Sequence, residues 1–177
     1  MKSKVMSVIR FFLILIILAC IAILGKRLLD YRTNANNNKE LANVVKEVES
    51  EMQHESVDNP DQNSNIDPWE QKHQHYLKVM DALAKKYNND DIVGFIEIPD
   101  VGIAYPVLQG ADNDFYLRRG INKEYDIAGS IFIDMNNKPD FNDDNTVIYG
   151  HHLEINSMFT PLDQYRKQEF AENHTTI

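Results

Sequence analysis

The sequence predicts a mostly β domain, a small barrel with helices before it, on an N-terminal membrane anchor. Two features from Asp91 onward predict the barrel: short runs of β-branched and aromatic residues recur between turn residues, and few helical patterns separate them. Short strands at such spacing are typical of a small β-barrel. A long apolar run near the N-terminus predicts the anchor.

Residues 1–32 are the expected membrane anchor. Fifteen uninterrupted apolar residues occupy Phe11–Gly25, whereas a membrane span needs about 20. The stretch reaches 21 residues when it is extended back to Val5 and Arg10 directs its charge toward the headgroups. Basic residues flank both ends, so they do not fix the orientation. The short leading tail favours an N-terminus inside the cell and a domain outside it.

Cys20 is the single cysteine and leaves a second interpretation of this segment open. Ile17-Leu-Ala-Cys20 resembles a lipobox, which would make Cys20 a lipidated residue. A cleaved signal peptide is less favoured, because Ala19-Cys20-Ile21 is a poor small-x-small site. Four more apolar residues follow Cys20, which favours an uncleaved anchor. With no cysteine elsewhere, no disulfide, zinc or iron–sulfur site is expected, and the sequence predicts no metal and no cofactor.

Two segments connect the anchor to the β region. Residues 33–67 have the composition of a polar stalk, rich in Asn and acidic side chains, with too little apolar surface to offset backbone entropy. Residues 68–90 are the expected N-terminal helix, with Asp67 as N-cap and Pro68 at its first position. A short amphipathic helix within the stalk is left open by apolar residues at helical spacing, namely Leu41, Val44, Val45, Val48 and Met52.

Residues 91–177 are the expected barrel segment. Pro106 lacks an N–H, so it predicts an edge or a bulge in its strand. The acidic loop 140–145 lacks the Gly and the terminal Glu of an EF-hand, so a solvated turn is favoured over a calcium site. Helical turns are expected at residues 112–117 and 157–165. The predicted strands are Val93–Ile98, Ile103–Leu108, Gly129–Asp134 and Thr146–Tyr149, with a fifth beginning at Asn173–Ile177.

The charge of the chain is distributed unevenly. Residues 1–32 hold six Lys or Arg and one Asp, a net charge of +5. The whole chain carries −9, so residues 33–177 carry −14. Nucleic-acid phosphates require a basic face, and this acidic segment therefore argues against a nucleic-acid partner.

A histidine pair at the end of the fourth predicted strand is the strongest candidate for chemistry. Gly150 ends the strand, and His151 and His152 follow it at once. A strand end fixes an imidazole while the loop keeps it accessible, and histidine titrates near neutral pH. The pair alone would also fit a polar loop. The serines nearby stand in no recognisable nucleophile motif, and Cys20 lies in the anchor.

Several sequence blocks follow one another in a fixed order: Asp91–Pro99, Ile103–Gln109, Asp112–Leu117, Ala128–Asp134, Asn145–His152 and Ser157–Phe159. Together they resemble the first half of class B sortases. Sortases are membrane-anchored cysteine transpeptidases of Gram-positive bacteria that cleave a C-terminal sorting signal after Thr and join it to a cell-wall or pilin amine. The resemblance implies a sortase-like β-barrel that is incomplete, with about the first four to five strands of eight.

The resemblance also implies roles for three residues. His151 matches the family's catalytic histidine, and Asn113 and Leu117 match positions that border the sorting-signal groove. The family's cysteine nucleophile and its arginine belong to the region after Ile177. This chain is therefore expected to be an inactive fragment by itself.

The partners that the resemblance implies are surface proteins with a sorting signal, a peptidoglycan precursor or pilin amine as acceptor, and the cell membrane. The chain would cross that membrane once near its N-terminus and place its domain outside. Two other functions stay open: a membrane-tethered domain that binds without catalysis, and a lipoprotein lipidated at Cys20.

Overall fold

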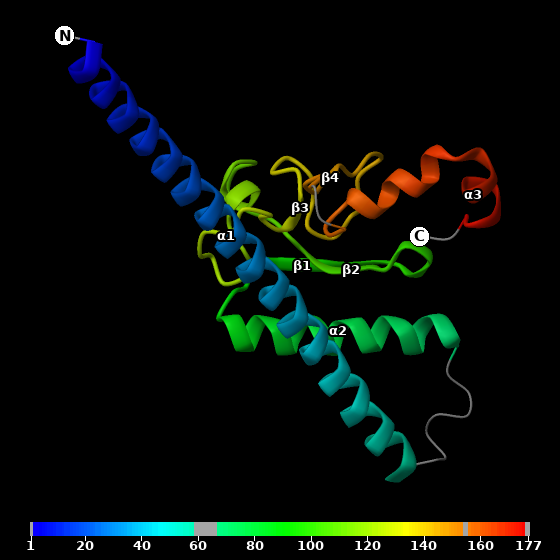
Figure 1. Cartoon of the computed structure of the whole chain (residues 1–177). Coiled ribbons are helices and arrows are strands. Elements are labelled where there is room, and N and C mark those ends of the chain that lie inside the picture. Colours follow the sequence, from blue (N-terminus) through cyan, green and yellow to red (C-terminus); the bar gives the residue numbers. More distant parts are fainter. Residues whose placement is uncertain (1, 59–66, 154–155, 176–177) are drawn as a thin grey trace.

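The computed structural model describes residues 2–58, 67–153 and 156–175. Two long helices precede the sheet: α1 spans Lys2–Asp58 and α2 spans Pro68–Tyr87. Figure 1 shows α1 running diagonally past α2 and the sheet, with its N-terminal half projecting away from the domain. Short helical segments in the connections are η2 (Pro99–Val101), η3 (Phe115–Arg118), η4 (Thr160–Arg166) and α3 (Gln168–Asn173).

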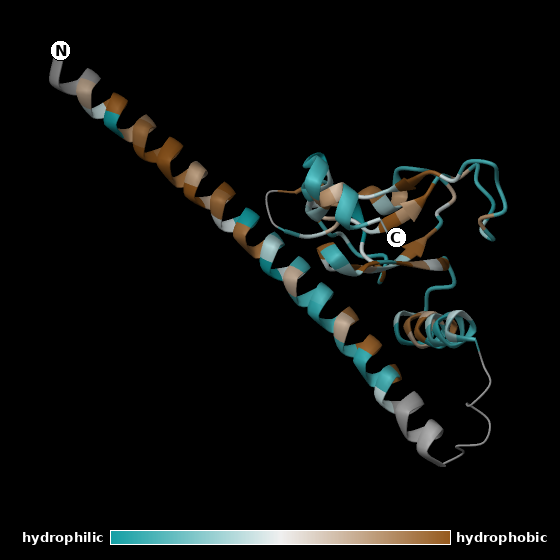
Figure 2. Ribbon diagram, turned by 90° about the vertical axis from the view of Figure 1, so that its right-hand side faces the viewer, coloured by the Kyte–Doolittle hydropathy of each residue, from teal (hydrophilic) through white to brown (hydrophobic). Residues whose placement is uncertain are grey.

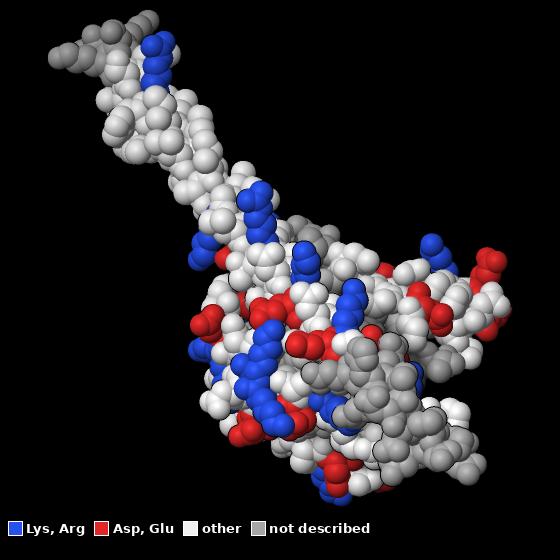
Figure 3. All heavy atoms as spheres, turned by 90° about the horizontal axis from the view of Figure 1, so that it is seen from below, with Lys and Arg blue, Asp and Glu red and all other residues white. Residues whose placement is uncertain are grey.

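The N-terminal half of α1 is apolar on all sides. Large apolar side chains from Met6 to Leu29 are exposed around the whole helix. Figure 2 shows this brown half of α1 away from the domain, and Figure 3 shows a stretch of it without charged side chains. Among the residues that the structure describes, α1 is the one helix long and apolar enough to cross a membrane. A signal sequence near the N-terminus would meet the same criterion.

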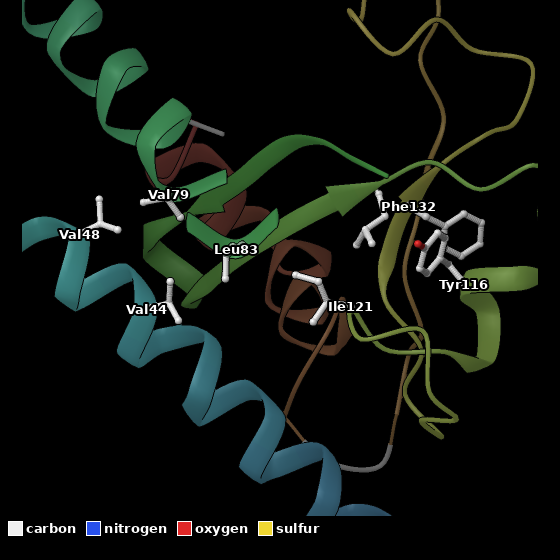
Figure 4. Close-up of a cluster of buried hydrophobic side chains, with 8 residues drawn as sticks. Val44, Val48, Val79, Leu83, Tyr116, Ile121 and Phe132 are labelled. Atoms are coloured by element: carbon white, nitrogen blue, oxygen red, sulfur yellow. The ribbon is translucent and has the colours of Figure 1, made fainter. Parts of the chain in front are cut away.

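Most of the segment expected as a polar stalk is helical, because α1 continues through it to Asp58. The rest of that segment, up to residue 66, lies outside the described residues. Val44 and Val48 of α1 are buried against Val79 and Leu83 of α2 (Figure 4). The apolar stripe that left an amphipathic helix open within the stalk is part of α1. It gains its burial from α2, a partner that composition alone does not reveal.

The start of α2 confirms the predicted cap. Asp67 Oδ1 accepts a hydrogen bond of 3.2 Å from the N–H of Trp69, and Pro68 occupies the first turn. Asn88 ends the helix in the left-handed region, with φ 48°. The cap fixes where α2 begins, and its buried face then packs on α1 and on the sheet.

The sheet has four strands in the order β1-β2-β3-β4. β1 and β2 are antiparallel, with Ile98 opposite Ile103, whereas β2 and β3 are parallel and β3 and β4 are antiparallel. Within the described residues the sheet is not closed, as expected for an incomplete barrel. The strand bounds are β1 (Ile92–Ile98), β2 (Ile103–Leu108), β3 (Ile131–Ile133) and β4 (Ile148–Tyr149).

Pro106 lies where β2 has one strand neighbour. It is opposite Phe95 of β1, whereas the pairing of β2 with β3 involves Val107 and Leu108. The missing N–H of Pro106 therefore removes no ladder bond to β3, which explains why proline is tolerated in this inner strand.

The expected start of a fifth strand is wrong for the residues that can be checked. Asn173 is the last residue of α3, and His174 and Thr175 form no strand. Residues 176–177 lie outside the described part. The β-branched residues at the end of the sequence suggested a strand locally. The residues just before them form the short helix α3 instead, in which the ring of Phe170 packs edge-on to that of Tyr165 in η4.

Three buried clusters hold the fold together. The first joins α1, α2 and one part of the sheet, and Figure 4 shows its side chains converging between these elements. The second joins β2 and β3 to the segment around Met158. The third packs β1, η2 and β2 against η4 and α3. The second cluster matters most for function, because it supports the end of β4, where the histidine pair lies.

Candidate functional site

The histidine pair begins directly after β4, at a glycine that packing requires. A Cβ on Gly150 would lie 2.5 Å from Ile131 Cδ1 and 2.6 Å from Phe159 Cδ2, far inside normal contact. The N–H of Phe159 donates to the His151 carbonyl over 3.1 Å. The backbone at His151 is therefore fixed between β3 and the segment around Phe159.

The imidazole of His151 is held by a backbone carbonyl. Its Nε2 lies 2.7 Å from the Leu117 carbonyl oxygen, at the end of η3. A carbonyl oxygen can only accept a hydrogen bond, so Nε2 carries the proton in this arrangement. Nδ1 is then the nitrogen that can exchange a proton with another group.

Asn113 lies in a second group, at the ends of β3 and β4. Its Nδ2 donates to Asp134 Oδ2 over 2.8 Å, and its Oδ1 accepts from the N–H of Met135 over 2.8 Å. The hydroxyl of Tyr149 also donates to Asp134 Oδ2, over 3.0 Å. Asn113 and Tyr149 are therefore joined through one carboxylate, and Tyr149 is two residues before His151.

Asp134 is held as a carboxylate by these donors. Its Oδ1 accepts two further hydrogen bonds from Asn136, from the backbone N–H at 2.8 Å and from Nδ2 at 2.9 Å. Hydrogen bonds to the charged form, those from Asn136 first and those from Asn113 and Tyr149 next, lower the pKa of Asp134 to about 2. The same contact raises the pKa of the Tyr149 hydroxyl. Both groups therefore keep one protonation state across the neutral range.

His152 has a different environment from His151. Its Nε2 lies 2.6 Å from Asp163 Oδ2 in η4, and its side chain is 62% exposed. The nearby imidazole lowers the pKa of Asp163. An exposed pair of this kind contributes little stability. A carboxylate-paired imidazole is nevertheless a known arrangement for a general base, so His152 needs its own test beside His151.

The structure brings two of the three predicted site residues together. His151 contacts the backbone of Leu117, whose side chain is 38% exposed, while Asn113 contacts Asp134 instead. The sequence reasoning missed Asp134 and Tyr149, although both lie at the ends of predicted strands, a place where functional side chains gather. Within the described ranges, no group of three or more His, Cys, Asp or Glu is arranged to hold a metal ion.

The comparisons with known proteins concern this same region. Residues 96–175, which run from within β1 to two residues beyond α3, match the family model of the sortase domain. Sortase B of Staphylococcus aureus is 41% identical over 106 residues, and sortase B of Listeria monocytogenes is 46% identical over 89 residues. Both of these curated relatives are class B sortases, and this chain is similar to them.

The solved structure of a Staphylococcus aureus sortase B–substrate complex has a fold similar to that of this chain. Its TM-score with this chain is 0.52 at 42% identity, over 59% of this chain and 48% of that one. The two curated relatives are matched over 43% and 36% of their own lengths, by 60% and 50% of this chain. The chain therefore spans less than half the length of the sortase B relatives that it matches.

Proposed function

We propose that these residues form the N-terminal part of a membrane-anchored class B sortase. A class B sortase is a cysteine transpeptidase. It cleaves a C-terminal sorting signal after Thr and transfers the protein to a cell-wall or pilin amine. The observation that carries the proposal is the position of His151, directly after Gly150 at the end of β4, within a segment that matches sortase domains.

His151 has the role of proton donor and acceptor in this proposal. Because Nε2 donates to the Leu117 carbonyl, Nδ1 exchanges the proton with the reacting groups. A protonated imidazole donates to the leaving amine as the thioester forms. The neutral imidazole then takes a proton from the incoming amine, which breaks the thioester.

The thiol of that reaction comes from outside these 177 residues. The one cysteine of the sequence is Cys20, exposed on the apolar half of α1. A thiol in a membrane span is remote from His151, at the end of β4. We therefore assign to this segment the histidine and one wall of the groove, and to other residues the nucleophile and the arginine that stabilises the oxyanion.

Asn113 and Leu117 border the sorting-signal groove in this proposal. The carbonyl of Leu117 already orients His151, so η3 supplies both a groove wall and the support of the imidazole. Asn113 is fixed by Asp134 and by the backbone of Met135, so it presents a rigid edge. The partners are surface proteins with a sorting signal and a peptidoglycan or pilin amine. The membrane is crossed once by α1, with the domain outside the cell.

A chimaera tests the assignment. Residues 1–177 would be fused to the C-terminal part of the Staphylococcus aureus relative that this chain does not match, and turnover would be measured with a fluorogenic sorting-signal peptide and an amine. We expect activity that His151→Ala reduces by about 10³-fold or more, whereas His152→Ala changes it little.

Three results of this experiment would count against the proposal. If His152→Ala abolishes turnover and His151→Ala is mild, the two histidine roles are exchanged. If the chimaera unfolds cooperatively but neither turns over nor binds the peptide, the segment has no sortase function. Peptide binding without turnover would favour the membrane-tethered, non-catalytic domain.

A further inference from the structure

Asp134 links two residues beside the candidate site through one carboxylate oxygen. Its Oδ2 accepts from Asn113 Nδ2 over 2.8 Å and from the hydroxyl of Tyr149 over 3.0 Å. Asn113 lies four residues before Leu117, whose carbonyl holds His151. Tyr149 is the last residue of β4, two residues before His151. Both partners of Asp134 are therefore close along the chain to the groups that place the imidazole.

Asp134 has no acceptor position left for a substrate. The hydrogen bonds from Asn136, followed by those from Asn113 and Tyr149, lower the pKa of Asp134 to about 2, so it is a carboxylate at neutral pH. A carboxylate has about four lone-pair positions. Two on Oδ2 are occupied by Asn113 and Tyr149, and two on Oδ1 by the N–H and Nδ2 of Asn136. Asp134 can thus act on a substrate only through the residues that it holds.

Because Asp134 only accepts, it determines which hydrogen atoms its two partners have left. The hydroxyl hydrogen of Tyr149 goes to Oδ2, so the phenol oxygen can only accept from a further group. The amide of Asn113 has one orientation, since its Oδ1 accepts from the Met135 N–H over 2.8 Å and one Nδ2 hydrogen goes to Asp134. Within the described part of the chain, the second Nδ2 hydrogen of Asn113 has no acceptor. The pair therefore presents one donor, on Asn113, and one acceptor, on Tyr149.

The donor and the acceptor are close together and accessible. Tyr149 is 38% exposed, and its ring is held against that of Phe132, with the ring centroids 5.2 Å apart. Asn113 is half-buried. Its Nδ2 and the Tyr149 hydroxyl oxygen lie no more than 5.8 Å apart, which is the sum of their distances to Asp134 Oδ2. An amide carries an acceptor oxygen and a donor N–H on one carbon, so it can bridge the two with hydrogen bonds of about 2.9 Å at each end.

We propose that Asp134 is a positioning residue, which orients Asn113 and Tyr149 so that they bind an amide group of the sorting-signal peptide. A carboxylate ligand only accepts, so it would find no donor on Tyr149 and would be repelled by Asp134. An ammonium ligand only donates, so it would meet the N–H of Asn113 without an acceptor. An amide matches both groups. This inference rests on the proposed sortase function, because it requires the peptide to lie beside His151.

Asp134→Asn in the chimaera described above tests the proposal. The substitution keeps the size of the side chain and replaces an acceptor by a group that also donates, so the hydroxyl hydrogen of Tyr149 is no longer fixed. We expect KM for the sorting-signal peptide to rise about 10-fold, as for the loss of one or two hydrogen bonds, while kcat stays within about two-fold. Tyr149→Phe removes the acceptor without touching Asp134 and should have the same effect.

A combination of variants separates this role from a merely structural one. In a background with both Asn113→Ala and Tyr149→Phe, Asp134→Asn should raise KM no further, because both groups through which it acts are gone.

Asp143→Asn is the matched control in the same connection between β3 and β4. Asp143 accepts from the Lys138 N–H over 2.6 Å, so it holds the loop, and none of its hydrogen bonds within the described residues involves Asn113 or Tyr149. Its substitution should leave KM unchanged.

Peptides in which one amide at a time is replaced by an ester identify the amide that is bound, in a side chain or in the main chain away from the scissile bond. An ester lacks the N–H that Tyr149 accepts, so the matching ester should raise KM of the wild-type chimaera. For that peptide alone, Tyr149→Phe should have no further effect.

A second readout needs no peptide. The paired Raman bands of a tyrosine ring change their relative intensity with the direction of the hydroxyl hydrogen bond. The spectrum of the full chain in micelles, minus that of the same chain with Tyr149→Phe, isolates Tyr149. We expect a donating hydroxyl in the wild type and in Asp143→Asn, and a shift toward an accepting hydroxyl in Asp134→Asn.

Three results would overturn this inference alone: wild-type KM in Asp134→Asn, an equal rise in KM in the doubly substituted background or in Asp143→Asn, and unchanged Raman bands in Asp134→Asn. A chimaera that neither binds nor turns over the peptide would overturn it together with the proposed function. The Raman comparison is made without the chimaera, so the two failures are distinguishable.

Discussion

Gly150→Ala is the substitution whose effect can be worked out most directly from the structure. The added methyl carbon would lie 2.5 Å from Ile131 Cδ1 and 2.6 and 2.8 Å from two atoms of the Phe159 ring. Gly150 has no left-handed φ, so the backbone itself accepts alanine. Any destabilisation must therefore come from this clash.

The size of this destabilisation follows from the distances between the added methyl group and its neighbours. Carbon atoms in contact are normally about 3.5–4.0 Å apart, so the neighbours must move by about 1 Å. Ile131 is 1% exposed and cannot give way into solvent. Overpacking of this kind costs about 1–3 kcal/mol, and we expect the free energy of unfolding to fall by that amount.

Gly150→Ala should reduce activity by more than its loss of stability alone would. Phe159 donates its N–H to the His151 carbonyl, so a shift of Phe159 carries His151 with it. A displacement of about 1 Å at a catalytic group can cost about 10²-fold in rate. In the chimaera described above, Gly150→Ala should therefore lower kcat by around that factor while the protein stays folded.

The measurement has a matched control within the chain. Gly25→Ala adds the same methyl group where nothing lies within 4 Å, in the apolar half of α1. Urea unfolding of the full chain in micelles should show the loss for Gly150→Ala and no loss for Gly25→Ala. Wild-type stability and turnover in Gly150→Ala would refute the packing argument and, with it, the account of how His151 is held.

Two further predictions concern the neighbouring groups. Asp134 has a depressed pKa of about 2, so the stability it contributes is present above its unfolded pKa of about 4 and is lost as the pH falls from about 4 to 2. In an NMR titration, the carboxyl resonance of Asp134 should shift over that low pH range in the wild type and at a higher pH in Asn113→Ala. An unchanged titration in Asn113→Ala would contradict the hydrogen bond from Asn113 to Asp134 as a cause of the lowered pKa. Leu83→Ala truncates a fully buried side chain and should lower the free energy of unfolding by urea by about 2–5 kcal/mol. Leu77→Ala, at a side chain in a residue that is 41% exposed, should lower it much less. Equal losses would show that Leu83 is not part of the packed core.

The local patterns predicted local structure well. Strand β2 was expected at Ile103–Leu108 and is found there, because its β-branched and aromatic residues follow a turn that ends at Gly102, with φ 70°. The helix start at Asp67 and Pro68 was likewise predictable, since the cap involves neighbouring residues. The end of β4 was predicted in the same way, and with it the place of His151.

The features that the sequence did not reveal depend on distant residues. The Leu117 carbonyl that orients His151 is 34 positions away from it, and Asn34 contacts Asp126 over 92 positions. Asp134 has no motif of its own, and its importance comes from Asn113 and Tyr149, which the fold brings to it. Local propensity also favoured a strand from Asn173 onward, whereas Asn173 ends α3, which packs on η4, and His174 and Thr175 form no strand.

The largest consequence of these long-range contacts concerns the relation between anchor and domain. A polar stalk would leave the domain free to rotate above the membrane, whereas α1 is one helix from the apolar half to Asp58. Its contacts with the domain run from Asn34 to Val48, fourteen residues or about 21 Å of helix. Between these ends, Lys86 of α2 pairs with Glu40 over 2.9 Å. Because the contacts are spread along the axis, they resist tilting as well as sliding of the domain against α1. In the proposed membrane-anchored sortase, the length of this helix would therefore set the height of His151 above the lipid.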